Sequence, residues 1–509
     1  MSQDAEHDTI ATGTARRVIG LVLGFGIFAL MLVSPPPAGL PVVGWHVAAV
    51  ASLMAIFWMT EALPVAATAL IPLDAFPILG VRTIGETTAP YANPLVFLFL
   101  GGFVIALTMQ RWNLHSRIAL ALLARAGDRM DILIAAFMGV TAFLSMWVSN
   151  TATTLMMIPI VLSVTILATG QSSAPVPNLG PKAQFAPALL LSVAYGASIG
   201  GMGTLVGTPP NAFLAAFMFE RYGLTIGFAQ WLMLGLPLVI IMLFIIWFLL
   251  TRVVFRLKGA HVGEASAVID EHHRALGPIT NAQKLTACLF VTTALLWVTR
   301  PWIAKTLGWP GLDDTVIAIG ATLAAFIIPV NWRRGIFLMD WDHAAKFPWG
   351  ILILFGGGLT LAAAIGKTGL AGWIGSQLTI FAGLPPILVI LAVVALVIFL
   401  TELTSNTATT ATFLPVMAAL AITLGENPLL LAVPAALAAS CAFMLPVATP
   451  PNAIVFGAGH LSVPQMARAG FLLNLAGIVV ITLVAYSLLL LAFGIEPGHL
   501  PVWVTPPAP

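Results

Sequence analysis

Long apolar stretches, many of them about 18 to 25 residues long, recur along the whole 509-residue chain and are separated by polar breaks. About 20 apolar residues in a helix are enough to cross the hydrocarbon core of a bilayer. The pattern therefore predicts eleven transmembrane helices. The predicted spans are 17–34, 40–58, 64–81, 92–110, 183–218, 228–251, 285–300, 315–331, 348–366, 427–456 and 469–493.

Two further apolar stretches, 131–168 and 385–424, are each interrupted midway by a polar Ser-Asn-Thr. Broken helices at membrane depth survive only where protein or a water-filled cavity satisfies the free backbone groups. We interpret both stretches as re-entrant helical hairpins, each entering and leaving by one face of the membrane. The predicted fold class is an all-α polytopic membrane protein.

The composition excludes several other classes of protein. Hydrophobic residues make up 60% of the chain and charged residues only 8%, against roughly 25% charged residues in soluble domains. The net charge of +2 and the lack of a long basic block exclude a nucleic-acid partner. The two cysteines, Cys288 and Cys441, lie in apolar segments, which excludes a disulfide framework and a cysteine-based zinc site.

The cationic residues predict the orientation, because Lys and Arg are enriched in cytoplasmic loops. With eleven spans and a cytoplasmic N-terminus, all but five of the 21 Lys and Arg residues fall on the cytoplasmic side. We therefore expect a multi-pass protein with its N-terminus in the cytoplasm and its C-terminus outside it. The five residues on the outer side are Arg82, Arg221, Arg300, Lys305 and Lys367.

The chain contains an internal repeat. Residues 149–154 and 405–410 both read Ser-Asn-Thr-Ala-Thr-Thr, an offset of 256, and the same offset maps Pro159 onto Pro415. A second motif, Thr-Pro-Pro-Asn at 208–211, recurs at 449–452 with an offset of 241. One duplicated unit with a shorter connection in its second copy explains both offsets.

The two copies are predicted to have opposite orientations, because five spans, an odd number, separate the two Ser-Asn-Thr motifs. Inverted repeats with paired interrupted helices near the membrane midplane are typical of secondary transporters. The polar stretch 258–283 is predicted to be a cytoplasmic linker between the two halves.

Each interrupted helix offers binding groups for two kinds of ion. The start of the second helix of a hairpin exposes N–H donors and a partial positive charge, which suit a carboxylate or another oxyanion. The prolines of each Thr-Pro-Pro-Asn force the chain out of a helix and free carbonyl oxygens, which suit a hard cation such as sodium. Anion and cation sites are therefore expected side by side.

No Lys or Arg lies within fifteen residues of either Ser-Asn-Thr in the sequence. A bound dianion would then be neutralised by helix dipoles and by cotransported cations. Two carbonyl-rich sites favour sodium over protons, although a buried carboxyl could relay protons. The candidates for such a relay are Glu61, Asp74 and Glu402, of which Glu402 is the strongest.

One motif points to a different class of function. Residues 196–200 read Gly-Ala-Ser-Ile-Gly and match the G-x-S-x-G elbow of serine hydrolases, with Ser198 as the nucleophile. The motif lacks a strand–turn–helix context and has no histidine nearby in the sequence. A hydrolase is therefore the weaker alternative.

The paired Ser-Asn-Thr and Thr-Pro-Pro-Asn motifs, together with Ala439, Ser440 and Phe443, make the chain resemble the divalent anion/sodium symporter family of dicarboxylate, citrate and sulfate transporters. The resemblance extends from about residue 17 to 493. It implies a homodimer in which a transport domain slides as an elevator along a fixed scaffold. The implied parts are a scaffold (1–127 and 284–380), a transport domain (128–257 and 381–495), the linker (258–283) and a tail (496–509).

The resemblance also implies site residues, which are carried over by motif. The first sodium site would use Ser145, Ser149, Asn150 and Gly207. The second would use Thr401, Thr404, Asn406 and Ala448. The substrate would contact Ser149, Asn150, Thr151, Ser405, Asn406, Thr407, Thr449 and Pro450.

Together these features predict sodium-coupled symport of C4-dicarboxylates, such as succinate, malate and fumarate, across the inner membrane. Sodium is the cotransported ion, and no organic cofactor is expected. The alternatives within transport are a dicarboxylate exchanger and a citrate or sulfate transporter of the same family.

Overall fold

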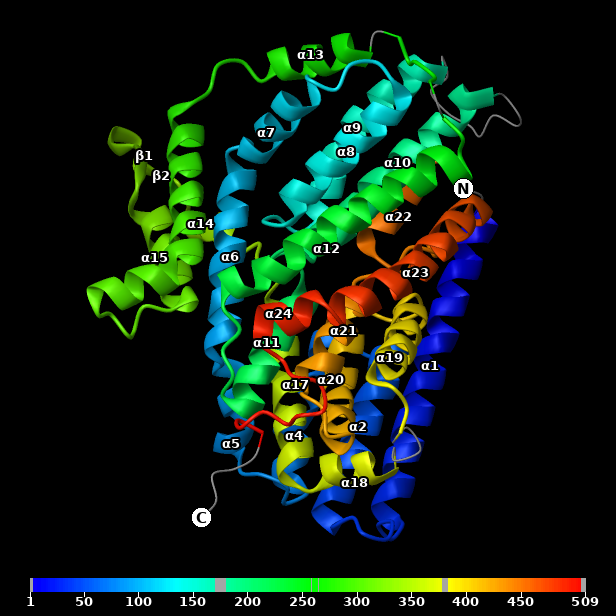
Figure 1. Cartoon of the computed structure of the whole chain (residues 1–509), viewed down its shortest axis with the longest axis vertical. Coiled ribbons are helices and arrows are strands. Elements are labelled where there is room, and N and C mark those ends of the chain that lie inside the picture. The colour runs from blue at the N-terminus through cyan, green and yellow to red at the C-terminus, as the bar shows by residue number, and fades with distance from the viewer. Residues whose placement is uncertain (1–2, 170–179, 258, 264, 378–382, 505–509) are drawn as a thin grey trace.

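The computed structural model describes residues 3–169, 180–257, 259–263, 265–377 and 383–504, and this part of the chain is mostly helical (Figure 1). The only strands within these residues are β1 (Pro329–Asn331) and β2 (Ile336–Phe337), which form a short antiparallel pair. The expectation of a mostly helical fold is therefore confirmed.

Seven of the helical segments are long and apolar enough to cross a membrane, and each overlaps one of the predicted spans. They show that the chain has at least seven candidate membrane spans. The segments are Ala15–Val33 within α1 (Gln3–Val33), α2 (Val42–Thr60), Ile84–Arg111 ending in α6 (Pro94–Arg111), Phe228–Val254 with α12 (Phe228–Phe248), α14 (Asn281–Leu307), α17 (Trp349–Lys367) and Val463–Phe493 with α23 (Val463–Ala485).

Three predicted spans are not continuous helices. Proline stands among the first two residues of the helix after each break, where it lacks the N–H that would continue the preceding helix. The breaks before Pro209 and Pro450 confirm the expectation that each Thr-Pro-Pro-Asn interrupts its helix, whereas the break within the predicted span 64–81 was not expected. The pairs are α3 (Val65–Thr68) with α4 (Ile71–Ile78), α10 (Gly180–Gly201) with α11 (Pro209–Tyr222), and α21 (Leu429–Ala439) with α22 (Pro450–Gly457).

Two helical hairpins form at the interrupted stretches. The first consists of α8 (Met130–Ser145) and α9 (Asn150–Thr169), and the second of α19 (Pro386–Thr401) and α20 (Asn406–Thr423). α8 and α19 have 16 residues each, which is about 24 Å of helix and less than the roughly 30 Å of a bilayer core. Each hairpin turns at its Ser-Asn, as the sequence predicted.

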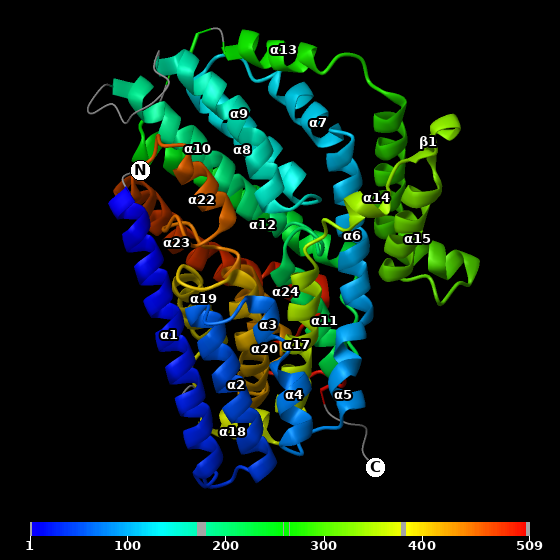
Figure 2. The ribbon, with the colours of Figure 1, turned by 180° about the vertical axis from the view of Figure 1, so that it is seen from behind.

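The two halves of the chain interlock. Figures 1 and 2 place the first hairpin in the upper half of the molecule and the second hairpin in the lower half. α20 of the second half packs against α11 of the first half, and α22 packs against both α9 and α10. Each half therefore contributes helices to the surroundings of the other half's hairpin.

The glycines of the Gly-Ala-Ser-Ile-Gly motif have a packing role. Gly196 and Gly200 lie on one face of α10, and a Cβ at either position would collide with the α8 backbone at Met138 or Ala142. Small residues spaced by four positions are a common device for close helix packing in membranes. Ser198 lies buried within the same helix. The motif therefore brings α8 and α10 together and forms no nucleophile elbow.

The linker between the halves contains a helix. α13 (Ala265–Ala275) buries Ala265 and Ile269 and packs against α9 and α7 (Leu114–Leu123). The predicted linker is therefore partly helical, because two apolar residues spaced four apart give the segment one face to bury.

The predicted span 315–331 is present as the helix α15 (Asp314–Ile327). The other remaining elements are short helices. They connect the longer helices or cap their ends. They are α5 (Ile84–Thr88), η1 (Ala89–Ala92), η2 (Leu249–Val254), η3 (Trp332–Arg334), α16 (Trp341–Ala344), α18 (Leu370–Gln377) and α24 (Leu488–Phe493).

Candidate substrate and cation site

The tip of the first hairpin is held together by its own polar groups. The buried Ser145 hydroxyl donates to Oδ1 of Asn150 at 2.6 Å. Thr154, one turn into α9, donates to the backbone carbonyl of Asn150 at 2.8 Å. These bonds fix the Asn150 side chain at the point where α8 has ended and α9 begins.

The second hairpin repeats this arrangement. Thr401 donates to Oδ1 of Asn406 at 2.8 Å, and Thr410 donates to the Asn406 carbonyl at 2.8 Å. Thr401, Asn406 and Thr410 stand 256 residues after Ser145, Asn150 and Thr154. The repeat found in the sequence is therefore also a repeat of hydrogen bonds.

The asparagine of each Thr-Pro-Pro-Asn shapes the break before it. Asn211 Nδ2 donates to the carbonyls of Gly201 at 3.3 Å and Thr204 at 2.8 Å. Asn452 Nδ2 donates to the carbonyls ten and seven residues before it, both at 3.0 Å. Because Pro lacks an N–H and the helix is interrupted, these carboxamides take over the carbonyls that a continuous helix would have bonded.

The groups predicted for the first cation meet at one glycine. A Cβ at Gly201 would collide with Oδ1 of Asn150, at 2.8 Å, and would lie in tight contact with the Gly207 carbonyl, at 3.1 Å. Ser145, Asn150 and Gly207 are therefore gathered where the hairpin tip faces the break, and their oxygens are of the kind that hard cations prefer.

The groups predicted for the second cation are only partly joined. Thr401 also donates to the Ala439 carbonyl at 2.9 Å, which links the hairpin to the end of α21. Thr404 bonds within its own hairpin, to the Leu400 carbonyl and the Thr409 hydroxyl. Ala448 lies in the break and donates its N–H to the Leu445 carbonyl.

The residues predicted for the substrate lie at helix starts, and most of them are partly exposed. Ser405 is the N-cap of α20, and its side chain makes no capping bond. First-turn N–H groups of such a helix remain available to an anion. Thr449 is buried and Pro450 is exposed. Ser149, Asn150, Thr151, Ser405, Asn406 and Thr407 all have intermediate exposure.

Glu402, the strongest of the relay candidates, is held by several hydrogen-bond donors. Its carboxylate accepts hydrogen bonds from the backbone N–H groups of Phe443, Met444 and Leu445 and from Nδ2 of Asn474. A carboxyl in an apolar segment is a sequence signal for function, but only the fold reveals these partners. Glu402 fastens the second hairpin to the break before α22.

Arg16 is a second residue near the site, and sequence reasoning missed it. Its guanidinium donates to the Met59 carbonyl at 2.6 Å and to the Leu403 carbonyl at 3.5 Å, at the tip of the second hairpin. Although no Lys or Arg lies near either Ser-Asn-Thr motif in the sequence, the fold brings Arg16 close to the second motif. No local pattern could have revealed this contact, since 387 residues separate Arg16 and Leu403.

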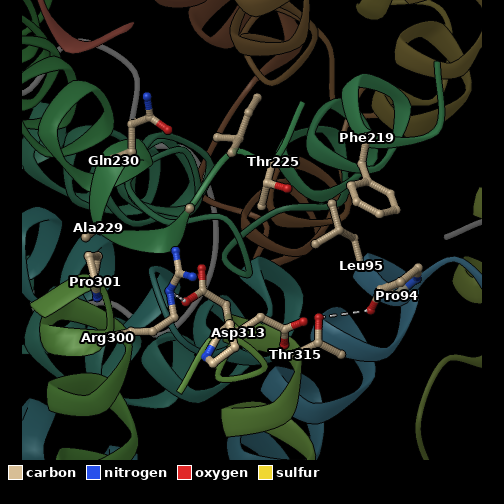
Figure 3. Close-up of a pocket in the computed structure, with 14 residues that line it drawn as sticks. Pro94, Leu95, Phe219, Thr225, Ala229, Gln230, Arg300, Pro301, Asp313 and Thr315 are labelled. Atoms are coloured by element: carbon tan, nitrogen blue, oxygen red, sulfur yellow. Dashed lines mark hydrogen bonds and ion pairs between the residues drawn. The ribbon is translucent and has the colours of Figure 1, made fainter. Parts of the chain in front are cut away.

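One cavity of the described residues lies away from this site. It measures about 460 Å³ and is lined by residues from the start of α6, the α11–α12 connection and the α14–α15 connection (Figure 3). An ion pair between Arg300 and Asp314, with a 2.8 Å separation, stands in its wall. Asp314 also accepts a 2.7 Å hydrogen bond from the Phe228 N–H. None of the predicted site residues lines this cavity.

Comparison with known proteins identifies the family. The family described as the sodium:sulfate symporter transmembrane region matches residues 15–492. The chain belongs to this family. Its members are transporters, so the hydrolase alternative is excluded.

Relatives in this family include a sodium-dependent dicarboxylate transporter, SdcS, of Staphylococcus aureus. The protein from strain USA300 is 42% identical over 487 residues, which cover 95% of this chain and 93% of the relative. The protein from strain MRSA252 is 42% identical over 499 residues, with 97% and 95% of the two chains covered.

Two solved transporter structures share the fold at low sequence identity. The YdaH transporter of Alcanivorax borkumensis has a TM-score of 0.58 at 15% identity, covering 96% of this chain and 99% of its own. MtrF of Neisseria gonorrhoeae has a TM-score of 0.57 at 13% identity, covering 96% and 97%. Their likeness shows that this chain shares their fold.

Proposed function

We propose that the protein is a symporter that couples the uptake of C4-dicarboxylates, such as succinate, malate and fumarate, to sodium across the inner membrane. The observation that carries the proposal is the repeated pairing of a hairpin tip with a helix break, each fixed by matching hydrogen bonds. The SdcS relatives are sodium-dependent dicarboxylate transporters, which supports both sodium and a dicarboxylate as the transported species.

Two sets of oxygens are proposed to bind sodium. In each set, a hydroxyl and a carboxamide oxygen from a hairpin tip would join a backbone carbonyl from the facing break. Such neutral oxygen ligands suit sodium, which like other hard cations prefers oxygen. The first set is Ser145, Ser149, Asn150 and Gly207, and the second is Thr401, Thr404, Asn406 and Ala448.

The substrate carboxylates are proposed to bind at the starts of α9 and α20. Helix N-termini supply N–H donors and a partial positive charge, and the half-exposed side chains supply further donors. Sodium held beside them would neutralise the dianion, and Asn150 and Asn406 would touch both ligands. The substrate residues are Ser149, Asn150, Thr151, Ser405, Asn406, Thr407, Thr449 and Pro450.

The proposed architecture has eleven spans and two re-entrant hairpins in an inverted repeat, with the N-terminus cytoplasmic and the C-terminus periplasmic. A homodimer would hold the scaffold still while the transport domain slides as an elevator. The scaffold would comprise 1–127 and 284–380, and the transport domain 128–257 and 381–495. The interlocking of the two halves supports one moving body built from both hairpins.

Uptake of labelled succinate into proteoliposomes tests the proposal. An inward sodium gradient is expected to drive accumulation, and unlabelled malate and fumarate are expected to compete. Citrate or sulfate competing more strongly would favour the alternatives in this family. Uptake that depends on internal dicarboxylate and ignores sodium would indicate an exchanger and contradict the proposal.

A further inference from the structure

A buried carboxylate stands beside only one of the two sodium sets. Glu402 is 4% exposed, and both of its oxygens face donors. The distances are 2.7 Å from Phe443 N, 2.9 Å from Met444 N, 3.1 Å from Leu445 N and 2.8 Å from Asn474 Nδ2. Within the described residues, no Lys, Arg or His forms an ion pair with it.

The first half joins the same two segments without a charge. The offset of 256 maps Glu402 onto Met146, and the offset of 241 maps Leu445 onto Thr204. In the first half, the Thr204 hydroxyl donates to the Met146 carbonyl at 2.5 Å. A neutral bond therefore links hairpin and break in one half, and a carboxylate links them in the other.

We infer that Glu402 is a positioning residue that makes the two sodium sites unequal, so that the second set binds sodium more tightly and fills first. The inference rests on the proposed sodium-coupled function. The carboxylate of Glu402 is held by hydrogen bonds and has no ion-pair partner within the described residues. A negative charge in a low-dielectric interior attracts a nearby cation far more strongly than it would in water. The first set lacks such a charge, since Met146 occupies the equivalent place.

The hydrogen bonds of Glu402 also connect it to the geometry of the second set. Its neighbour Thr401 bonds both Asn406 and the Ala439 carbonyl. The backbone it holds, 443–445, leads to Ala448, whose N–H bonds the Leu445 carbonyl. The carboxylate therefore supports ligands on the hairpin and in the break together.

Asn474 extends this support to α23. Its Nδ2 donates to Glu402, and Asn474 is fully buried. Gly470, one turn earlier on α23, lies so close to the break that a Cβ there would collide with the Phe443 carbonyl. The break, the hairpin and α23 therefore meet at the carboxylate, which explains why its loss would change the second set rather than the first.

Equilibrium binding of labelled sodium to the purified full-length protein, without substrate, tests the inference. The wild type is expected to bind sodium in two steps of different affinity. Glu402→Gln keeps the shape and removes the charge, so the tighter step is expected to weaken about tenfold. Met146→Gln is the matched control in the first half and is expected to leave the tighter step unchanged.

Glu402→Asp is the conservative variant. It keeps the charge but withdraws it by one methylene, so the tighter step is expected to weaken by about threefold. Equal weakening of both steps by Glu402→Asp, or no change in Glu402→Gln, would overturn the inference. So would an equal effect of Met146→Gln on the tighter step.

Sodium-driven succinate uptake by the same proteins separates this inference from the proposed function. Wild-type uptake that depends on sodium, together with equal sodium affinity in wild type and Glu402→Gln, would overturn only the role of Glu402. Wild-type uptake that ignores sodium would overturn the proposed function itself.

Discussion

The hydroxyl of Ser145 donates to Oδ1 of Asn150 at 2.6 Å, and the pair closes the first hairpin around the proposed sodium and substrate groups. Because Thr401 and Asn406 form the same pair at 2.8 Å, equivalent substitutions in the two halves are expected to have the same kind of effect.

Asn150→Ala and Asn406→Ala are each expected to weaken sodium and succinate binding together, by about tenfold for each ligand. The carboxamide is proposed to touch both ligands, so its removal acts on both. Linkage requires that substrate raise sodium affinity by the factor by which sodium raises substrate affinity. Isothermal titration of each ligand, with and without the other, measures these affinities.

A loss of succinate affinity with unchanged sodium affinity in either variant would contradict the shared-ligand interpretation. Ser163→Ala is a suitable control on α9, because Ser163 lies outside the proposed groups and its hydroxyl is 3.2 Å from Nε2 of His272 in the linker. It is expected to leave both affinities unchanged.

The close approach of α10 to α8 gives a stability prediction. A Cβ at Gly200 would collide with the Ala142 backbone, so Gly200→Ala is expected to destabilise the protein by about 1–3 kcal/mol. Gly139→Ala on α8 is the matched control, since a Cβ there meets nothing within 4 Å. It is expected to be neutral or to stabilise α8 slightly. Thermal unfolding of the detergent-solubilised variants measures the difference.

Equal melting temperatures for Gly200→Ala and wild type would contradict a packing role for the glycine. Ser198→Ala changes the residue between the two glycines and is expected to retain transport. Loss of activity in this variant would be expected only if Ser198 were a catalytic nucleophile.

Much of the site could be predicted from the sequence, because the repeated motifs contain the residues that bond to one another within each hairpin tip. Ser145, Asn150, Thr401 and Asn406 occupy equivalent places in a duplicated motif, and equivalent residues of a duplicated unit adopt the same local bonds. The hairpin turns are equally local, since the polar Ser-Asn interrupts an apolar run.

The remainder depends on contacts between distant parts of the chain. Apolar content alone predicts a continuous span over 64–81, but a new helix begins at Ile71, with Pro72 as its second residue, after a break at Ala69 and Leu70. The partners of Glu402 lie on α23 and in the second break, and Arg16 lies on α1. Periodicity and motif spacing carry no information on such pairings.

Comparing Arg16 with its neighbour Arg17 tests whether the positive charge of Arg16 at the second hairpin affects substrate binding. In the part of the chain that the structure describes, Arg17 donates to the Ala62 carbonyl just beyond α2, whereas Arg16 donates to Met59 and Leu403. A guanidinium beside the hairpin tip attracts a dianion, so Arg16→Ala is expected to raise the KM for succinate about threefold. Arg17→Ala is expected to leave the KM within error.

Initial uptake rates at saturating sodium give both KM values. Arg16→Lys keeps the charge and is expected to restore most of the affinity, which a purely structural role of the guanidinium fork would not allow. Equal KM values for Arg16→Ala and Arg17→Ala would contradict an electrostatic role for Arg16.

The contact between α6 and the loop before α16 gives a prediction about pH. Asp340 pairs with Arg111 at 2.6 Å, and His343 donates its backbone N–H to the same carboxylate at 2.9 Å. Desolvation opposes ionisation of Asp340, but the hydrogen bonds from His343 and the charge of Arg111 outweigh it, so the pKa of Asp340 is lowered.

A carboxyl whose pKa is lowered by folding contributes stability that is fully present above its unfolded pKa, about 3.9. That contribution is lost as the pH falls through the lower folded pKa. Asp340→Asn is therefore expected to lower the melting temperature between pH 5 and 7, and the difference from wild type is expected to shrink as the pH falls below about 4. Asp342→Asn, a substitution next to the pair, is the control and is expected to show neither effect. Melting curves of both variants and the wild type across this pH range measure the differences. A difference between Asp340→Asn and wild type that stayed constant down to pH 3 would show that the carboxylate charge does not stabilise the contact.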